Sequence, residues 1–245
     1  MLAELLAHSG KAILTGIPPN GKDYWAARFW DRESAEQHPL LRGDFLIQKD
    51  TIADFLRDHG GDAGRVLEFA CGTGEFTALA AEHTPAREIT ALDISAEGLR
   101  RARERVRHDN LRLVQGDFWT DNGLGTADLV MCVDAIHHLG DVAEVLTRLK
   151  AFVRPGGTLI GNLWTADHFH EFQRKRYGSV EHLRRTAAFF GTALMIRASR
   201  GKLKTGAYRT QLVRSEQALA ILHSVFPEVV EVRRQKYFMG FVCKV

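Results

Sequence analysis

The chain has 245 residues, of which 45% are hydrophobic, 26% charged and 9% aromatic, a composition typical of one soluble globular domain rather than a disordered or fibrous protein. No apolar run reaches the roughly 18 residues that a membrane helix needs, and the N-terminal stretch lacks a signal-peptide pattern. We therefore expect a cytoplasmic protein without a membrane anchor. Cys71, Cys132 and Cys243 lack Cys-x-x-Cys spacing and lie in or beside apolar runs, so we expect buried free thiols and neither disulfides nor a metal site.

Residues 1–60 have a helical pattern that ends in DFLIQKDTIADFLRDHGG, and we expect them to form a helical N-terminal cover. The stretch KDYWAARFWDRESAEQHP within it concentrates aromatic residues: Tyr24, Trp25, Phe29 and Trp30. Aromatic residues at helical spacing belong to a core more often than to a binding site. Here they lie in a cover element, which favours a pocket for a flat organic molecule.

Residues 61–165 alternate strand and helix patterns at the spacing of βαβ units. The expected strands are 65–69, 88–93, 111–117, 127–134 and 157–164, and the expected helices are 76–83, 94–107 and 141–153. Because the strands are apolar throughout, they belong to a parallel sheet that is covered on both faces. This part of the sequence predicts a doubly wound α/β core.

Residues 166–212 follow the fifth strand and predict a helical, basic insertion. Within it, residues 172–209 carry ten Lys or Arg and a single acidic residue, Glu181. Such a segment attracts RNA, a phosphate or an acidic substrate, or it is simply a solvated helix face, and both interpretations stay open.

Residues 213–245 contain a last helix, SEQALAILHSVF, and two strand-like segments that we expect to turn near Met239 and Gly240. A C-terminal hairpin brings the expected sheet to seven strands. The sequence thus predicts a single α/β domain with a doubly wound, Rossmann-like, mostly parallel seven-stranded sheet that ends in an antiparallel hairpin.

The stretch VLEFACGTGEF (66–76) places Gly72 and Gly74 directly after the first strand. Side chains are missing from this strand-to-helix turn, as they are where a nucleotide-like cofactor lies against the backbone. A Gly-x-Gly pair can also serve only to shape the turn, so its neighbours must decide between the two readings.

An acidic residue lies near the carboxyl end of each of the first four strands: Glu68, Asp93, Asp117 and Asp134. Each alone could be a helix N-cap, but ligands of open α/β sheets bind at this edge, and four acids there favour a binding crevice. Asp93 can accept hydrogen bonds from ribose hydroxyls beside an apolar contact from Ile94. Asp117 and Phe118 suit an exocyclic amine and its ring, whereas Glu68 suits a positively charged group.

These segments together resemble the class I S-adenosylmethionine-dependent methyltransferases. VLEFACGTG resembles the glycine-rich motif of this family, ALDIS its ribose-binding motif, GDF its adenine-binding motif, ADLVMCVDAIHHL its fourth strand and RPGGTLI the approach to its fifth. The resemblance implies S-adenosyl-L-methionine as the cofactor. It places Glu68, Ala70, Gly72 and Gly74 along the methionine half, Asp93, Ile94, Asp117 and Phe118 around the adenosine, and Asp134 beside the cofactor or an amine. Ala70 stands where the family often has glycine.

A methyltransferase of this kind aligns a nucleophile with an already activated methyl group and needs no covalent enzyme intermediate. His137 and His138 follow the fourth strand and are candidate catalytic residues together with Tyr24, although a histidine pair here can also be structural. Candidate substrate-binding residues are Tyr24, Trp25, His137, Trp164 and His168. Residues 1–60 and 166–212 would then cover the methyl acceptor.

The sequence predicts a monomeric or homodimeric enzyme of secondary metabolism that methylates an oxygen, nitrogen or nucleophilic carbon of a small, aromatic metabolite. Methylation of RNA or protein through residues 172–209 is an alternative. The chain lacks the Asn/Asp-Pro-Pro-aromatic signature of base amino-group methyltransferases, so we do not expect a nucleic-acid partner. A second alternative is a cofactor-binding scaffold without catalysis, and the acceptor itself stays open.

Overall fold

The computed structural model describes residues 42–120, 123–184, 186–187 and 212–245. These residues form a seven-stranded sheet in the order β3-β2-β1-β4-β5-β7-β6. The pairs among β1 to β5 are parallel, and β7 runs antiparallel to both β5 and β6. The strands are β1 Arg65–Phe69, β2 Glu88–Asp93, β3 Leu111–Gln115, β4 Ala127–Cys132, β5 Val153–Trp164, β6 Glu228–Arg234 and β7 Phe238–Lys244. The predicted fold class is confirmed.

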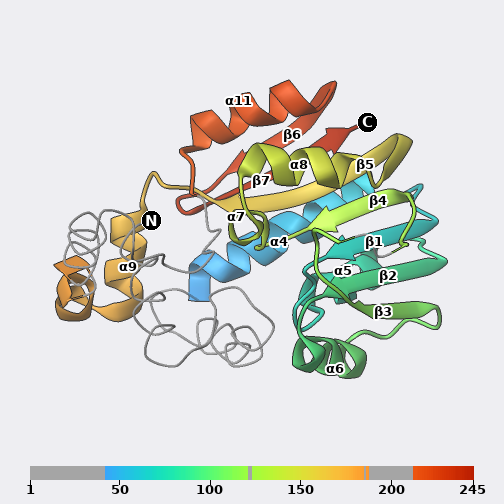
Figure 1. Ribbon diagram of the computed structural model, residues 1–245, viewed down its shortest axis with the longest axis horizontal. Helices are drawn as coiled ribbons and strands as arrows, with labels where there is room; N and C mark the ends of the chain where they lie inside the picture. The colour runs from blue at the N-terminus through green and yellow to red at the C-terminus, as the bar shows by residue number, and fades with distance from the viewer. Residues whose placement is uncertain (1–41, 121–122, 185, 188–211) are drawn as a thin grey trace.

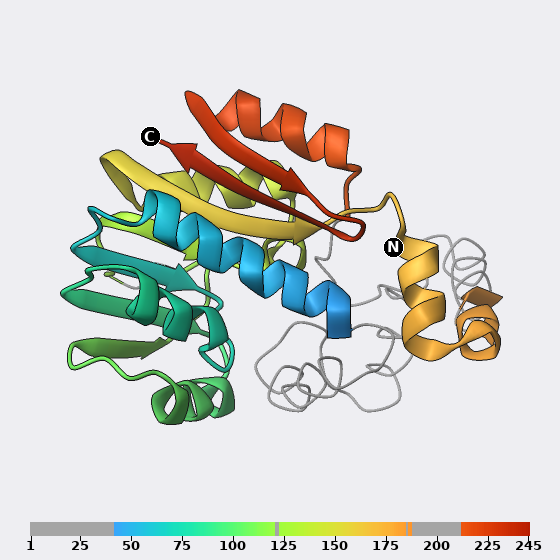
Figure 2. The same ribbon diagram turned by 180° about the vertical axis from the view of Figure 1, so that it is seen from behind.

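Helices cover both faces of the sheet (Figures 1 and 2). The helices α4 Arg42–His59, α5 Glu75–His83 and α6 Ala96–Arg105 lie on one face, and α8 Val142–Lys150 and α11 Ser215–Val225 lie on the other. The short helix α7 Ile136–Leu139 follows β4, and α9 Phe169–Tyr177 follows β5. Fully buried side chains such as Ile52 of α4 and Leu146 of α8 pack on the two faces of the sheet, as the continuous apolar strands predict.

The C-terminal hairpin turns at residues 235–237, so the predicted turn at Met239 and Gly240 is wrong. Both residues lie inside β7. A Cβ at Gly240 would stand 3.0 Å from the Phe55 ring and 3.3 Å from the Thr51 methyl group. This glycine therefore allows α4 to pack closely on the strand, a reason for glycine that local sequence does not reveal.

Three strands begin or end a few residues away from the predicted positions. The third strand ends at Gln115 rather than Asp117, and the fourth ends at Cys132 rather than Asp134. The fifth strand begins at Val153, which pairs with Ala127 before a bulge, whereas we expected a helix to continue to that residue. Asp117 and Asp134 thus lie in the turns that follow their strands, where ligands bind in this fold class, whereas Glu68 lies within β1 and Asp93 ends β2.

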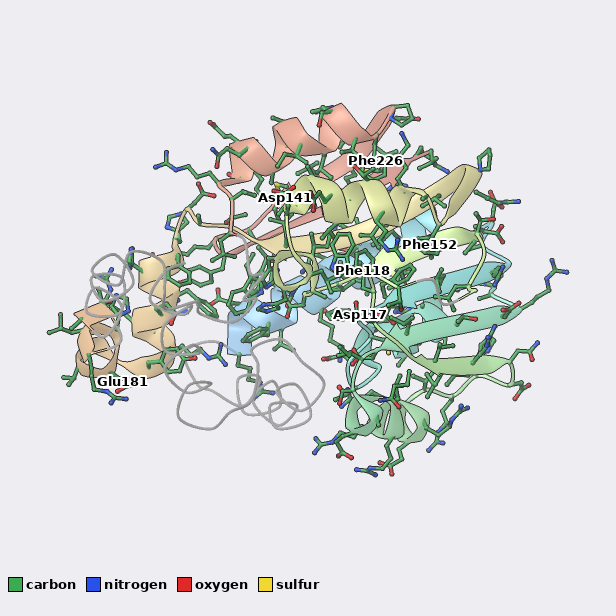
Figure 3. All side chains as sticks on the ribbon, in the orientation of Figure 1. Asp117, Phe118, Asp141, Phe152, Glu181 and Phe226 are labelled. Atoms are coloured by element: carbon green, nitrogen blue, oxygen red, sulfur yellow. The ribbon has the colours of Figure 1, made fainter. Side chains whose placement is uncertain are left out.

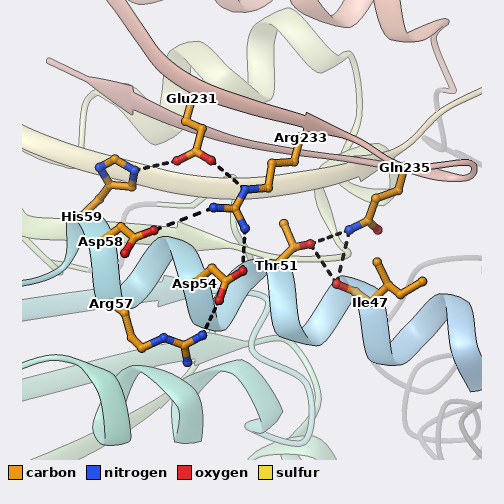
Figure 4. Close-up of polar contacts among 9 residues, drawn as sticks. All are labelled: Ile47, Thr51, Asp54, Arg57, Asp58, His59, Glu231, Arg233 and Gln235. Atoms are coloured by element: carbon orange, nitrogen blue, oxygen red, sulfur yellow. Dashed lines mark hydrogen bonds and ion pairs between the residues drawn. The ribbon is translucent and has the colours of Figure 1, made fainter.

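Helix α4 is fastened to the hairpin by the polar network in Figure 4. Arg233 of β6 forms ion pairs with Asp54 at 2.6 Å and with Asp58 at 3.8 Å. His59 Nε2 lies 2.8 Å from Glu231 Oε2. The Arg233 guanidinium lies over the Phe55 ring, 4.9 Å from its centroid. These contacts hold α4 against β6 of the C-terminal hairpin.

The three cysteines are buried free thiols, as predicted. Within the described residues, no helix is both long enough and apolar enough to span a membrane. Helical structure after β5 includes α9 and residues 179–184. Of the predicted cover residues, Tyr24 and Trp25 lie outside the described residues, as do Phe29, Trp30 and most of the basic segment.

Candidate active site

The turn between β1 and α5 has an unusual backbone. Ala70 has a φ of 55°, Gly72 of 56° and Gly74 of 75°, all in the left-handed region. The turn is closed by Gly74 N–H, which donates to the Cys71 carbonyl at 2.9 Å, and is tied to β2 by Cys71 N–H, which donates to the Leu92 carbonyl at 3.1 Å. Ala70 adopts the conformation that glycine adopts without strain, which explains why glycine suits this position.

Gly74 serves helix packing as well as the turn. A Cβ there would stand 2.8 Å from the Ala102 Cβ and 3.0 Å from Val106. The bare side of this residue thus faces α6, whereas we predicted that it lies along a cofactor. Arg105 also comes from α6 and donates to the Thr73 hydroxyl at 2.6 Å, so α6 holds the turn in place.

Asp93 joins the glycine turn to the end of β2. Its carboxylate accepts hydrogen bonds from Gly72 N–H and from Ser95 N–H, both at 2.8 Å. The side chain is buried, and this burial raises the pKa of Asp93 despite the hydrogen bonds from the backbone, which lower it. Because a carboxylate has about four acceptor sites, these two bonds leave capacity for a ligand's hydroxyl groups.

Two further carboxyl groups, those of Glu68 and Glu75, belong to the elements on either side of the turn. Glu68 is buried on β1 and accepts a hydrogen bond from the Thr77 hydroxyl of α5. Glu75 begins α5 and pairs with Lys49 of α4 at 3.0 Å. A carboxylate at the N-terminus of α5 already complements the helix dipole. This acidic environment suits a cation, such as a sulfonium or an amine, better than a phosphate.

The predicted adenine residues have contrasting environments (Figure 3). Asp117 is exposed and accepts a hydrogen bond from Trp119 N–H at 2.8 Å, which shapes the turn after β3. Phe118 is only 3% exposed and packs edge-on against Phe69 at 5.3 Å. Ile94 is half-buried after β2. Asp117 and Ile94 are thus accessible, while Phe118 belongs to the core and offers a ligand little surface.

Asp134 follows β4 with a φ of 60°, a left-handed conformation that a residue with a side chain rarely adopts. Its carboxylate oxygen Oδ1 accepts hydrogen bonds from Gln48 Nε2 of α4 at 3.0 Å and from Trp164 Nε1 at the end of β5 at 2.5 Å. Its backbone N–H donates to Asn162 Oδ1 of β5 at 2.5 Å. We name Asp134, Gln48, Asn162 and Trp164 the Asp134 cluster.

Sequence reasoning missed Gln48 and Asn162. Both are 1% exposed, an unusual degree of burial for amides. Gln48 lies in a helix, where nothing in the local sequence indicates its role. Asn162 is a polar residue within the otherwise apolar strand GTLIGNLW, and this was the one local signal.

His137 is buried under this cluster. Its ring stacks on Trp164 at 5.4 Å between centroids, and its Nδ1 accepts a hydrogen bond from Trp164 N–H at 3.4 Å. Burial lowers the pKa of His137 to about 3. The imidazole is therefore neutral at physiological pH with its proton on Nε2, which argues against its predicted role as a base. His138 is half-buried and lies 4.1 Å from the His137 ring.

Trp164 and His168, both predicted to contact a substrate, differ in environment. Trp164 is half-buried and packs edge-on against Phe172 at 4.5 Å and Phe238 at 5.5 Å. His168 is exposed and lies 3.7 Å from Glu171. Over the described ranges, no group of three or more His, Cys, Asp or Glu residues is arranged to hold a metal ion.

Comparisons with known proteins identify the domain. A family model described as a methyltransferase domain matches residues 66–157. Residues 66–157 therefore form a class I S-adenosylmethionine-dependent methyltransferase domain. The match spans the glycine turn, Asp93, Asp117, Asp134 and the histidine pair, so the predicted family is confirmed and S-adenosylmethionine is the cofactor of the domain.

Curated relatives match part of this chain. An uncharacterized methyltransferase of Mycobacterium tuberculosis is 38% identical over 114 residues, which cover 46% of this chain and 56% of the relative. A trans-aconitate 2-methyltransferase of Deinococcus radiodurans is 36% identical over 110 residues, 45% of this chain and 41% of the relative. The matches cover between 24% and 56% of the length of the first such relatives. They therefore identify a shared domain and do not establish the activity of the whole protein.

Among solved structures, magnesium protoporphyrin IX methyltransferase from Synechocystis with bound SAH superposes with a TM-score of 0.60. The superposition covers 91% of this chain and 98% of that one at 14% identity. At this identity the likeness establishes the fold alone.

Proposed function

We propose that this protein transfers the methyl group of S-adenosylmethionine to an oxygen, nitrogen or nucleophilic carbon of a small organic metabolite. The observation that carries the proposal is the buried Asp93 carboxylate, which bridges Gly72 N–H and Ser95 N–H beside an acid-lined glycine turn. That arrangement offers acceptors for ribose hydroxyls and a negative environment for a sulfonium.

The residues present fit this cofactor. Asp93 would hold the ribose, Ile94 and Asp117 the adenine, and the backbone at Ala70 and Gly72 the methionine half. Glu68 would add negative charge below the turn. When bound, S-adenosylmethionine supplies a methyl group on a positively charged sulfur. The remaining task of the protein is to hold the acceptor in line and to exclude water.

A small-molecule acceptor is supported by the name of one similar protein, a trans-aconitate 2-methyltransferase. We propose that the acceptor lies against the Asp134 cluster, with Trp164 as its aromatic wall and His168 near the entrance. His137 would orient this wall through its stacking and its bond to Trp164 N–H rather than remove a proton.

The alternative of RNA or protein methylation rests on the basic segment. Two of its described cations are already engaged, because Lys175 pairs with Asp44 at 3.7 Å and Arg176 lies 5.1 Å from the Tyr177 ring centroid. This favours a solvated face. Reversing the charge of Arg174, Lys175 and Arg176 should therefore leave small-molecule turnover intact and reveal no salt-sensitive RNA binding.

One experiment separates the candidate functions. The protein is incubated with S-adenosylmethionine that carries a deuterated methyl group and, separately, with small-molecule, RNA and protein fractions of the cells that produce it. Mass spectrometry then locates the label. We expect label in the small-molecule fraction. Label in RNA or protein would support the alternative, and cofactor binding without label in any fraction would support a scaffold.

A further inference from the structure

Two turns border the point of the sheet where ligands bind in this fold class. From the central pair β1 and β4, the chain continues to β2 and β3 on one side and to β5 on the other, and open α/β sheets bind ligands at such a switch point. The last paired residues of β1 and β4 include Glu68 and Met131, two residues before Ala70 and three residues before Asp134. The two turns therefore leave the sheet at nearly the same level, one on each side of the crevice.

Both turns contain a residue with a side chain in the left-handed backbone conformation. Ala70 has a φ of 55° and Asp134 of 60°, and no other non-glycine residue in the described ranges has a positive φ. Such a conformation persists only where the surroundings enforce it, and it is concentrated at functional sites. Ala70 belongs to the glycine turn, which Asp93 holds through the Gly72 N–H. At Asp134 the enforcing group comes from β5.

Asn162 of β5 binds the backbone of the turn after β4. The pairing of β4 with β5 ends at Cys132 and Gly161, directly before Asn162. There Asn162 Oδ1 accepts a hydrogen bond from Asp134 N–H at 2.5 Å, so a side-chain oxygen replaces the carbonyl that a longer ladder would supply. The chain can therefore leave the sheet after β4 while β5 continues along β7 to Trp164. This bond involves the backbone of Asp134 and does not depend on what its carboxylate contacts.

A second side chain ties the same turn to β5 in the opposite sense. His137 follows Asp134 by three residues, and its Nδ1 accepts a hydrogen bond from Trp164 N–H at 3.4 Å. The His137 ring is buried and stacks on Trp164 at 5.4 Å between centroids. Burial lowers the pKa of His137 to about 3, so the ring stays neutral and Nδ1 stays an acceptor at physiological pH. Side chain to backbone bonds thus hold the segment after β4 at two points.

Stability alone does not explain asparagine at position 162. The side chain is 1% exposed, and its Nδ2 is buried without a hydrogen-bond partner in the part of the chain that the structure describes. Because Oδ1 must face the Asp134 N–H, the amide cannot be reversed to pair Nδ2 elsewhere. A leucine of nearly the same size, followed by an ordinary turn, would avoid both the unpaired amide and the strained backbone. Asparagine is therefore explained by the bond that it makes to the turn.

We propose that Asn162 is a positioning residue for the cofactor, whose bond to the Asp134 N–H holds the turn after β4 in the shape that borders bound S-adenosylmethionine. The inference rests on the proposed placement of the cofactor in the crevice between β1 and β4. Asn162 does not touch the cofactor, because its side chain is buried and its oxygen is bound to the turn. Since it acts through a strained backbone, it should become dispensable when that strain is removed.

A double-mutant cycle in the purified full chain isolates this role. Asn162→Leu removes the acceptor and keeps the side-chain volume. Asp134→Gly supplies a residue that adopts a φ of 60° without strain, and a third variant combines the two substitutions. Thr158→Val is the control, because Thr158 lies four residues earlier in β5 and is 4% exposed. Calorimetry gives the affinity for S-adenosylhomocysteine, a single defined ligand, and the unfolding temperature is measured for each variant.

In the parent background, Asn162→Leu should weaken S-adenosylhomocysteine binding about tenfold, because the unsupported turn leaves its left-handed conformation. In the Asp134→Gly background the same substitution should weaken binding less than about threefold, since glycine needs no support there. Thr158→Val should lower the unfolding temperature while the affinity stays within about twofold of the parent, because the two sites are independent. The control thus separates positioning of the cofactor from stability.

Equal losses of affinity in the two backgrounds would overturn the proposal, as would parent affinity in folded Asn162→Leu. If Asn162→Leu does not fold, Asp134→Gly should restore folding, and an unfolded double variant would also overturn the proposal. A parent protein that binds no S-adenosylhomocysteine would contradict the proposed function and this inference together. An additive cycle in a parent that does bind it would contradict this inference alone.

Discussion

The glycine turn and the Asp134 cluster lie at neighbouring strand ends but are built differently. In the turn, Asp93 binds backbone N–H groups of Gly72 and Ser95, which are 21 and 2 residues away. In the cluster, Asp134 is held mainly by side chains, and Gln48 and Trp164 lie 86 and 30 residues away. The turn therefore depends on main-chain geometry, whereas the cluster depends on where α4 and β5 meet.

This difference suggests how the two halves of the site can change. Because the turn is held by hydrogen bonds to main-chain N–H groups, few side-chain substitutions can alter it. Such a turn suits a ligand that stays the same, such as a cofactor. A cluster made of distant side chains can be modified one residue at a time to suit a different acceptor. Substitutions in each region test this division.

The largest effect is expected at Gly74. In Gly74→Ala the new Cβ meets Ala102 at 2.8 Å in a left-handed backbone, and we expect overpacking and strain to lower the free energy of unfolding by about 3–5 kcal/mol. Gly123→Ala is the control, because that residue has a φ of 61° but no atom within 4 Å of its Cβ. It should lose only about 1–2 kcal/mol in chemical denaturation. Equal losses would mean that packing on α6 is unimportant.

A smaller effect separates ligand binding from folding at Asp93. Asp93→Asn removes the charge beside the ribose and should weaken S-adenosylmethionine binding about 10- to 100-fold, as expected for hydrogen bonds to a charged group. Asp128→Asn is the control, because Asp128 also accepts a backbone N–H, from Arg65 at 2.7 Å, but at the opposite edge of the sheet. Calorimetry should give parent-like affinity for the control. Parent affinity in folded Asp93→Asn would contradict the assigned role.

The pH dependence of stability tests the burial of His137. Its pKa falls from an ordinary value of 6.5 to about 3 on folding, so below pH 6.5 the unfolded chain binds a proton that the folded chain does not. Stability is therefore complete above pH 6.5 and is lost as the pH falls toward 3. Between pH 6.5 and 5 the parent should lose about 2 kcal/mol more than His137→Phe in denaturant unfolding. Equal losses would show that the imidazole is accessible to solvent.

The smallest effect concerns Ala70. Because its φ is 55°, Ala70→Gly relieves strain and should raise the free energy of unfolding by about 0.5–1 kcal/mol with unchanged cofactor affinity. Ala78→Gly, in the interior of α5, should instead lower it by about 1 kcal/mol. A loss of stability in Ala70→Gly would mean that the alanine methyl group makes contacts that outweigh the strain.

The sequence predicted the sheet, its parallel core and its hairpin, because continuous apolar strands and short turns are local signals. It also located Asp93 and the glycine turn for the same reason. It did not predict Gln48 or Asn162, whose roles depend on contacts between α4, β4 and β5, and it placed the hairpin turn at Gly240, where glycine instead admits Phe55. The state of His137 depends on complete burial, which a sequence motif does not report.

The measurement that tests the account most directly is a calorimetric titration of S-adenosylmethionine into the full chain, with NAD as the comparison ligand. We predict one S-adenosylmethionine per chain, strongly reduced binding in Asp93→Asn, and no measurable binding of NAD, whose pyrophosphate would meet the acid-lined turn at Glu68 and Glu75. Binding of NAD in preference to S-adenosylmethionine, or binding of neither, would contradict the account.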